Sequence, residues 1–469
     1  MEPKRMPGRT ARPASAARPV RSARPVRQAR PARPVRSAQP VRPAQTAGPV
    51  RSAQKKQSAF SNLFHTGGMD IPFLCLVFIL FAVGITMMYS ASYVYAQNKY
   101  GNPNYFFFRQ LIWGALGFAA MWVISKIDYR ILNSVLAPIA CILTVLLLIA
   151  TFLLNLHEEV RRWIKIGPLQ FQPSEIAKFV MVLTLAYLIC IFYRVMPADP
   201  RRRTVPRVVG LTRMEQSFLS YFDNDFKCTV LLALVVAMFC GLIIIEKHLS
   251  CTILMFLMGV SMMWVGGVKK KWFLFLAVAA AAAFILVYLK PDLLEGVGFG
   301  YDRVMVWKTK EATANADYWQ TRQGLLAIGS GGPFGVGFGN SKQKYLYIPE
   351  PQNDFIFAVV VEELGYIGGT LIILLFAALV CRGFMIATRT RDLFGALLVI
   401  GIVMQVGLQV ILNIAVVTDT IPNTGIGLPF FSYGGTALFF MLCQMGVVLS
   451  VSRRVPVRVP KPAGEEEAV

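Results

Sequence analysis

Carboxylates stand at the start of one long apolar segment of the chain and also inside it. Asp354 lies near the beginning of this segment, which covers residues 353–381, and Glu362 and Glu363 follow about two helical turns further in. A segment of this length can cross a bilayer, which takes about 20 apolar residues. An ionised group at membrane depth is costly unless it is paired or faces a wet cavity, and a carboxylate near a hydroxyl can take its proton. The pattern indicates a functional site. The alternative is that Asp354 only caps the helix and that a neighbouring helix neutralises the two glutamates.

A second polar group leads into the apolar segment at 174–194. Pro173 suits the first turn of a helix, and Glu175 and Lys178 are three residues apart, so they share one helix face. The basic residue Arg162 lies in the loop ahead of them. Two interpretations remain open: an ion pair within one helix, or a charged support for a polar pocket next to Asp354.

Two glycine-containing stretches complete the polar motifs. The first, residues 329–339, holds six glycines whose amides can cradle phosphate oxygens, and its alternative role is plain loop flexibility. No strand or βαβ unit surrounds it, which disfavours a nucleotide fold. The second, residues 423–435, predicts irregular, partly wet backbone at the start of the last apolar segment, or else close helix packing through small residues.

The elements that position these motifs are membrane helices. With 55% hydrophobic and only 16% charged residues, the chain is predicted to be an all-α polytopic membrane protein. Ten apolar runs are long enough to be spans: 71–93, 108–125, 131–155, 174–194, 228–246, 249–267, 271–290, 353–381, 393–417 and 429–452.

The distribution of Lys and Arg predicts that both termini are cytoplasmic. The inner segments 126–130, 195–227, 269–271 and 382–392 and the tail from Arg453 all carry positive charge. A large outer loop, 291–352, then lies between the seventh and eighth helices. This loop and the outer segment 156–173 retain several basic residues against that bias, which favours anion binding there.

The predicted domain boundaries separate a membrane domain, 69–452, from a tail at 1–68 and a short cytoplasmic tail at 453–469. Residues 1–56 contain fifteen Lys or Arg and one acid, Glu2, in repeated Arg-Pro-Val-Arg units, so this part is expected to be disordered. It suits anionic lipid headgroups. Nucleic acid is not expected as a partner, because no aromatic residue precedes Phe60. The first apolar run is expected to be an uncleaved anchor, and the eight cysteines show no CxxC spacing that would indicate a zinc site or a disulfide framework.

Three motifs, in order, resemble those of the SEDS family (FtsW, RodA and SpoVE). They are Gln172-Pro-Ser-Glu-Ile-Ala-Lys178, then Pro349-Glu-Pro-Gln-Asn-Asp-Phe-Ile-Phe-Ala358 with Glu362-Glu-Leu-Gly365, and Leu428-Pro-Phe-Phe-Ser-Tyr-Gly-Gly435. The resemblance covers residues 70–452. The segments 349–354 and 303–307 look more like FtsW and SpoVE than RodA.

The resemblance implies ten membrane helices and a peptidoglycan glycosyltransferase that polymerises lipid II into β-1,4 glycan strands at the bacterial cytoplasmic membrane, with cell division and the septum as the expected setting. It implies Asp354 as the catalytic acid/base. The substrate-binding or supporting residues are then expected to be Glu175, Lys178, Arg162, Glu350, Arg303, Lys344 and Ser432. The implied partners are lipid II and undecaprenyl-linked glycan, a class B penicillin-binding protein and other divisome membrane proteins.

Three further expectations complete the sequence-based picture. No cofactor is certain, and a divalent cation, Mg or Mn, is the candidate, although no metal-ligand set has a recognisable spacing. A lipid II flippase is the first alternative function, with polar residues near the midplane as its signature. A non-catalytic division scaffold that acts through the basic tail is the second.

Overall fold

The structure is a computed structural model that describes residues 68–133, 136–154, 162–166, 169–195, 225–289, 307 and 316–454. The two predicted tails therefore lie outside the described residues, apart from Gly68, Arg453 and Arg454. The first part of the predicted outer loop 291–352, up to residue 315, also lies outside them, apart from Trp307.

Each of the ten predicted spans coincides with a helix. Eight helices are long and apolar enough to cross a membrane within the part of the chain that the structure describes. They are α1 (Ile71–Tyr100), α2 (Tyr105–Lys126), α3 (Leu136–Leu154), α4 (Pro173–Val195), α6 (Asp225–Ile245), α11 (Ile356–Arg389), α12 (Leu393–Val417) and α13 (Gly435–Ser452). The other two predicted spans correspond to α7 (Leu249–Val265) and α8 (Lys270–Leu289). The fold is thus an all-helical polytopic membrane bundle.

The structure adds elements between the spans. A 3-10 turn, η2 (Tyr129–Asn133), joins α2 to α3, and an antiparallel hairpin of β1 (Ile164–Ile166) and β2 (Leu169–Phe171) precedes α4. Part of the predicted outer loop forms a helix, α10 (Ala316–Gly331), that packs against α11. Two boundaries also differ from expectation. Helix α11 continues through the basic residues expected in a loop, ending at Arg389, and α13 begins at Gly435 instead of 429.

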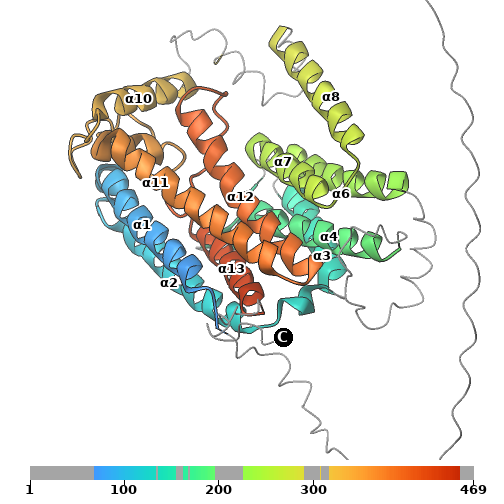
Figure 1. Cartoon of the computed structure of the whole chain (residues 1–469). Coiled ribbons are helices and arrows are strands. Elements are labelled where there is room, and N and C mark those ends of the chain that lie inside the picture. The colour runs from blue at the N-terminus through green and yellow to red at the C-terminus, as the bar shows by residue number, and fades with distance from the viewer. Residues whose placement is uncertain are drawn as a thin grey trace, which may run out of the picture. The chain divides into compact units, whose positions relative to one another are not determined.

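Helix α11 is central to the packing, because it lies against α1, α10 and α12 (Figure 1). Helix α13 packs along α2, and α4 contacts α3, α7 and α12. Glycines permit the closest approaches: an added Cβ at Gly446 would lie 2.8 Å from the Met121 carbonyl oxygen. Helices in lipid associate largely by such close packing, since lipid chains are as apolar as the helix surfaces.

Ion pairs join the helix ends at the predicted inner side. Asp70 caps α1 by accepting a hydrogen bond from the Phe73 amide at 3.0 Å, and both its carboxylate oxygens accept from the Arg382 guanidinium of α11, at 2.9 and 2.8 Å. Arg454, just beyond α13, pairs with Asp128. The sequence reasoning placed Arg382 in a loop. In the structure it lies in α11, where its guanidinium binds Asp70, the residue that caps the first turn of α1.

Candidate active site

A break in α11 brings the glycine-rich stretch into the bundle. Gly365 has φ +72° and ψ −179°, a conformation essentially confined to glycine, and it interrupts the helical hydrogen bonding. The stretch after α10 supplies the missing partners. The amides of Val336 and Gly337 donate to the carbonyls of Glu362 and Glu363 at 2.9 and 3.1 Å. In return, the Tyr366 and Ile367 amides donate to the carbonyls of Gly332 and Pro333. Non-helical backbone is tolerated inside a membrane protein when it is satisfied in this way.

The glycines are required by this close approach. An added Cβ at Gly335 would lie 2.2 Å from the Glu363 carbonyl oxygen, and one at Gly331 would lie 2.2 Å from that of Val361. Gly335 also has φ +80°. Plain loop flexibility does not describe residues 332–337, because the backbone of Gly332, Pro333, Val336 and Gly337 is hydrogen-bonded to α11.

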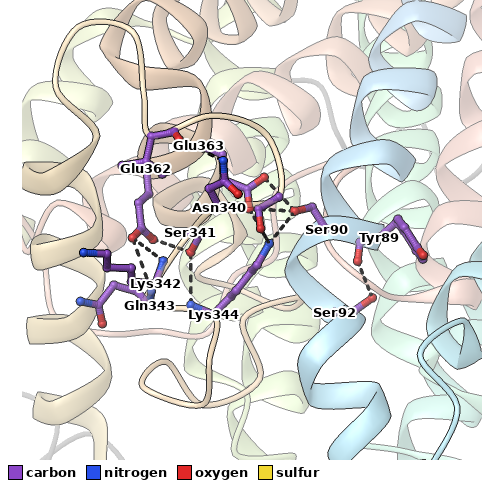
Figure 2. A network of polar contacts seen from close by, with 12 residues as sticks. Tyr89, Ser90, Ser92, Asn340, Ser341, Lys342, Gln343, Lys344, Glu362 and Glu363 are labelled. Carbon is purple, nitrogen blue, oxygen red and sulfur yellow. Dashed lines mark hydrogen bonds and ion pairs between the residues drawn. The ribbon is translucent and has the colours of Figure 1, made fainter.

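The side chains of Glu362 and Glu363 bind residues 341–344, the part of the chain that follows the glycine-rich stretch and is called the returning loop below (Figure 2). The Glu362 carboxylate accepts from the Ser341 hydroxyl at 2.5 Å and from the Lys342 amide at 2.9 Å. Glu363 accepts from the Lys344 ammonium at 2.9 Å and from the Ser90 hydroxyl of α1 at 2.7 Å. Glu363, Lys344 and Ser90 are all buried. The two acids are therefore partnered chiefly by the loop residues 341–344, whereas the alternative expected from the sequence was a neighbouring helix. The Ser90 hydroxyl of α1 is the one helical side chain among these contacts.

Asp354 lies half-buried just before α11. The helix starts at Ile356, and Phe355 occupies the cap position without a side-chain hydrogen bond, so the carboxylate of Asp354 does not serve as the side-chain cap of α11. The Gln320 amide of α10 makes a long contact of 3.5 Å to Asp354 Oδ1. A half-buried carboxylate in this position is suited to accept a proton from a substrate.

The segment between α12 and α13 encloses Asp354 from the other side. The Ser432 hydroxyl donates to the Asn353 carbonyl at 2.6 Å and accepts from the Leu428 amide, also at 2.6 Å. The Tyr433 amide donates to the Gln352 carbonyl at 2.8 Å. Ser432 thus fixes the backbone of the Asp354 segment. The residues 423–435 are irregular backbone up to α13, as the sequence indicated.

Glu350 is an exposed neighbour of this segment. Its carboxylate accepts from the Tyr95 hydroxyl of α1 at 2.9 Å and from the Asn353 amide at 2.7 Å, and the Lys99 ammonium lies 3.9 Å away. The residue has φ +46°, which is uncommon for glutamate. Glu350 therefore shapes the turn that leads to Asp354.

The second predicted cluster forms at the start of α4. Lys178 and Glu175 are 2.8 Å apart, and the Lys178 side chain is only 3% exposed. The Gln172 amide lies 3.3 Å from His248 Nδ1, which connects this cluster to the turn between α6 and α7. Arg162 lies half-buried ahead of β1. The intrahelical ion pair anticipated from the spacing is present.

One acid of this region was missed in the sequence. Glu246 follows α6 directly and is fully buried, and neither oxygen of its carboxylate has a hydrogen-bond partner. Burial raises the pKa of Glu246 to about 8. The sequence reasoning treated it as the last residue of a span. Its position beside the polar residues Lys247 and His248 was the available signal that the membrane helix had ended.

Other predicted residues are placed differently. Arg303 lies outside the described residues, although Trp307, from the same motif, donates to the Asp419 carbonyl at 3.1 Å. Lys344, expected near substrate, has its ammonium bound to Glu363 and to the Gly339 carbonyl.

The sequence-based prediction overlooked the polar residues of α12. The Asn413 amide contacts the Asp354 segment, and the four-residue spacing of Gln409 and Asn413 in an apolar span was the signal.

No group of three His, Cys, Asp or Glu residues is arranged to hold a metal ion within the parts of the chain that the structure describes. The donor set around Asp354 consists mainly of amides and backbone carbonyls. These described residues do not form a fitting site for the expected divalent cation.

Comparisons with known proteins identify similar chains. A family model described as FTSW_RODA_SPOVE, cell cycle protein, matches residues 71–456. Stage V sporulation protein E of Bacillus subtilis is 34% identical over 395 residues, covering 82% of this chain and 97% of its own. A protein of Geobacter sp. named "Probable peptidoglycan glycosyltransferase FtsW" is 31% identical over 400 residues, covering 83% of this chain and 98% of its own.

Solved structures share the fold. A chain from a peptidoglycan synthase complex, solved to explain how polymerisation and crosslinking are coordinated, superposes with a TM-score of 0.63 at 24% identity, covering 82% of this chain and 98% of that chain. The rod shape determining protein RodA of Thermus thermophilus gives 0.54 at 24% identity, with coverage of 83% and 98%.

Proposed function

Since the chain belongs to the SEDS family of FtsW, RodA and SpoVE and is a multi-pass protein of the cytoplasmic membrane, we propose that it is a peptidoglycan glycosyltransferase that polymerises lipid II. The observation that carries the proposal is the placement of Asp354. The residue is half-buried at the predicted outer end of the bundle. Its carbonyl accepts from Asn413, and the preceding carbonyl, of Asn353, accepts from Ser432.

In the proposed reaction, the 4-hydroxyl of an acceptor sugar attacks the anomeric carbon of a lipid-linked donor. Asp354 takes the hydroxyl proton as the new β-1,4 bond forms, and undecaprenyl pyrophosphate leaves with the electrons of the broken bond. The attack inverts the configuration at the anomeric carbon. The Gln320 amide donates a long hydrogen bond to the carboxylate and helps to orient it.

The leaving pyrophosphate carries negative charge that positioned cations stabilise. Among the residues predicted for this role, we assign it to Arg162. We assign Lys178 to the support of the start of α4, since its ammonium is paired with Glu175 and its side chain is only 3% exposed. We assign Lys344 to the support of the returning loop, since its ammonium is buried against Glu363. Arg303 stays a proposed substrate residue on the strength of the motif alone.

The biological setting belongs to the same proposal. The motif resemblance and the FtsW relatives favour a role in cell division at the septum, with both termini cytoplasmic, and a class B penicillin-binding protein and other divisome membrane proteins as partners. The likeness to a chain of a peptidoglycan synthase complex supports a crosslinking partner of this kind. The basic N-terminal tail is proposed to bind anionic lipids.

The test is glycan polymerisation from purified lipid II by the wild-type protein and Asp354→Asn, each with and without the cognate class B penicillin-binding protein. Asn keeps the shape of the side chain but cannot take a proton, so we expect a loss of at least about 100-fold. The matched control is Asp419→Asn, the same change of acid to amide two residues beyond the end of α12, at a residue with no assigned role, which should retain most activity.

Each other outcome redirects the assignment. Equal polymer from wild type and Asp354→Asn would remove Asp354 from the mechanism. No polymer from either, with the partner present, would shift the assignment to lipid II translocation or to a scaffold. Chelation followed by addition of Mg²⁺ or Mn²⁺ tests the divalent cation expected from the sequence. A rate of polymerisation that resists the chelator would show that the reaction does not need it.

A further inference from the structure

One face of α12 carries three amide side chains within an otherwise apolar helix. Gln405, Gln409 and Asn413 are each four residues apart and therefore share that face. Gln405 and Asn413 are buried and Gln409 is half-buried. Polar side chains in a membrane helix are costly in free energy and usually face protein or a functional cavity, so this face of α12 is a candidate for a functional role.

Asn413 makes the most informative contacts. Its side chain is fully buried, and its amide nitrogen donates to the Asp354 carbonyl at 2.7 Å and to the Ile426 carbonyl at 2.6 Å. Two acceptors use both of the protons that an amide nitrogen carries. One side chain of α12 therefore joins the Asp354 segment to the stretch between α12 and α13.

Three consecutive carbonyls of the Asp354 segment accept hydrogen bonds from this side of the site. The Gln352 carbonyl accepts from the Tyr433 amide, that of Asn353 from the Ser432 hydroxyl, and that of Asp354 from Asn413. The first two donors belong to irregular backbone. Asn413 differs because it belongs to a regular membrane helix, so it ties both irregular stretches to the rigid frame of the bundle.

We propose that Asn413 is a positioning residue for the reaction, setting where the Asp354 carboxylate stands relative to the substrate. The inference rests on the proposed function, in which Asp354 takes a proton. Asn413 itself touches only backbone at this point, and it acts through Asp354. A misplacement of a reacting group by about 1 Å can cost roughly 100-fold in rate, so the loss of both bonds should be visible in turnover.

A series at this position separates positioning from folding. Asn413→Leu keeps a similar size but has no donor. Asn413→Asp keeps the shape but turns acceptor oxygens toward two carbonyls. Asn413→Gln keeps both donors on a side chain that is one methylene longer. We expect kcat for lipid II polymerisation to fall about 100-fold for the Leu and Asp variants, with KM changed only a few-fold, and the Gln variant to recover at least about 10-fold of the loss.

The matched control is Gln409→Leu, one turn away. Gln409 donates to the Gly427 carbonyl at 3.0 Å, in the same stretch that Asn413 contacts, but to no carbonyl of residues 352–354. We expect its kcat to stay within a few-fold of wild type. Thermal unfolding of every variant in detergent accompanies the kinetics. A purely structural role predicts that activity follows stability, with Leu better tolerated than the longer Gln, whereas positioning predicts the opposite order of activity.

Two results would overturn the proposal: wild-type kcat in Asn413→Leu, or an activity order that follows stability through the series. If Asn413→Leu does not fold, Asn413→Ala, which also has no donor, replaces it, and an unchanged kcat there has the same meaning. Asp354→Asn in the same assay keeps the two questions apart. Wild-type activity in Asp354→Asn would refute the proposed function, while its inactivity beside a fully active Asn413→Leu would refute the positioning role alone.

Discussion

The burial of Glu246 favours the protonated, uncharged form of its carboxyl group. It is fully buried without a hydrogen-bond partner for either oxygen, and desolvation raises its pKa to about 8 from the ordinary value of 4.5. The folded protein therefore holds a proton between these two pKa values that the unfolded chain has released. Stability from this group is greatest below the unfolded pKa and is lost as the pH rises through that window.

Glu246→Gln should remove this dependence, because an amide does not titrate. We expect the variant and the wild type to have similar melting temperatures at about pH 5, and the variant to be the more stable at about pH 8. Melting temperatures in detergent across this range provide the measurement. Glu350→Gln is the control, since it removes the same charge from an exposed site. Parallel curves for Glu246→Gln and wild type would mean that Glu246 is ionised in the folded protein.

At the scale of elements, α11 consists of two helical pieces joined at Gly365. The stretch that follows α10 supplies the backbone hydrogen bonds that are missing at this break. Gly335→Ala tests this arrangement, because the added methyl meets the Glu363 carbonyl and the residue already has φ +80°. We expect the free energy of unfolding to fall by about 1–3 kcal/mol. The measurement is denaturation in detergent.

Gly329→Ala is the matched control for Gly335→Ala. It lies in α10 with no atom within 4 Å of its added Cβ, so it should be neutral or slightly stabilising. Equal stability of the two variants would show that the loop does not pack against α11 as described.

The helices were predictable, but their interruptions were not. Hydropathy and length identified all ten predicted spans, because the apolar requirement of lipid acts on every residue of a span. The break at Gly365 depends on partners some 30 residues earlier, Gly332 to Gly337, and no local pattern reveals such a pairing. Likewise, the Glu175–Lys178 pair follows from helical spacing, whereas Lys344 was expected near substrate because its partner Glu363 becomes adjacent only in the fold.

At the scale of the whole molecule, one buried ion pair joins three parts of the bundle. Lys344 comes from the returning loop, Glu363 from α11 and Ser90 from α1, and the two charged side chains are 4% and 0% exposed. Removing one charge leaves the other buried alone, which typically costs about 3–5 kcal/mol, while removing both costs less.

A double-mutant cycle measures this coupling. Lys344→Met and Glu363→Gln should each be strongly destabilising, and the double variant should be more stable than the sum of the single losses predicts. The free energy of unfolding in detergent is the quantity to compare. Additive losses would mean that the two side chains do not interact in the folded protein.

The sequence spacing of these contacts has a consequence for biosynthesis. Glu362 is 21 residues from Ser341, and Glu363 is 19 residues from Lys344, whereas Ser90 is 273 residues from Glu363. The chain is made from its N-terminus, so Ser341 and Lys344 leave the ribosome before the two acids. Glu363 can therefore enter the bilayer already paired with Lys344, and Glu362 already hydrogen-bonded to residues 341–343. The distant contact with α1 needs to form only when the helices assemble.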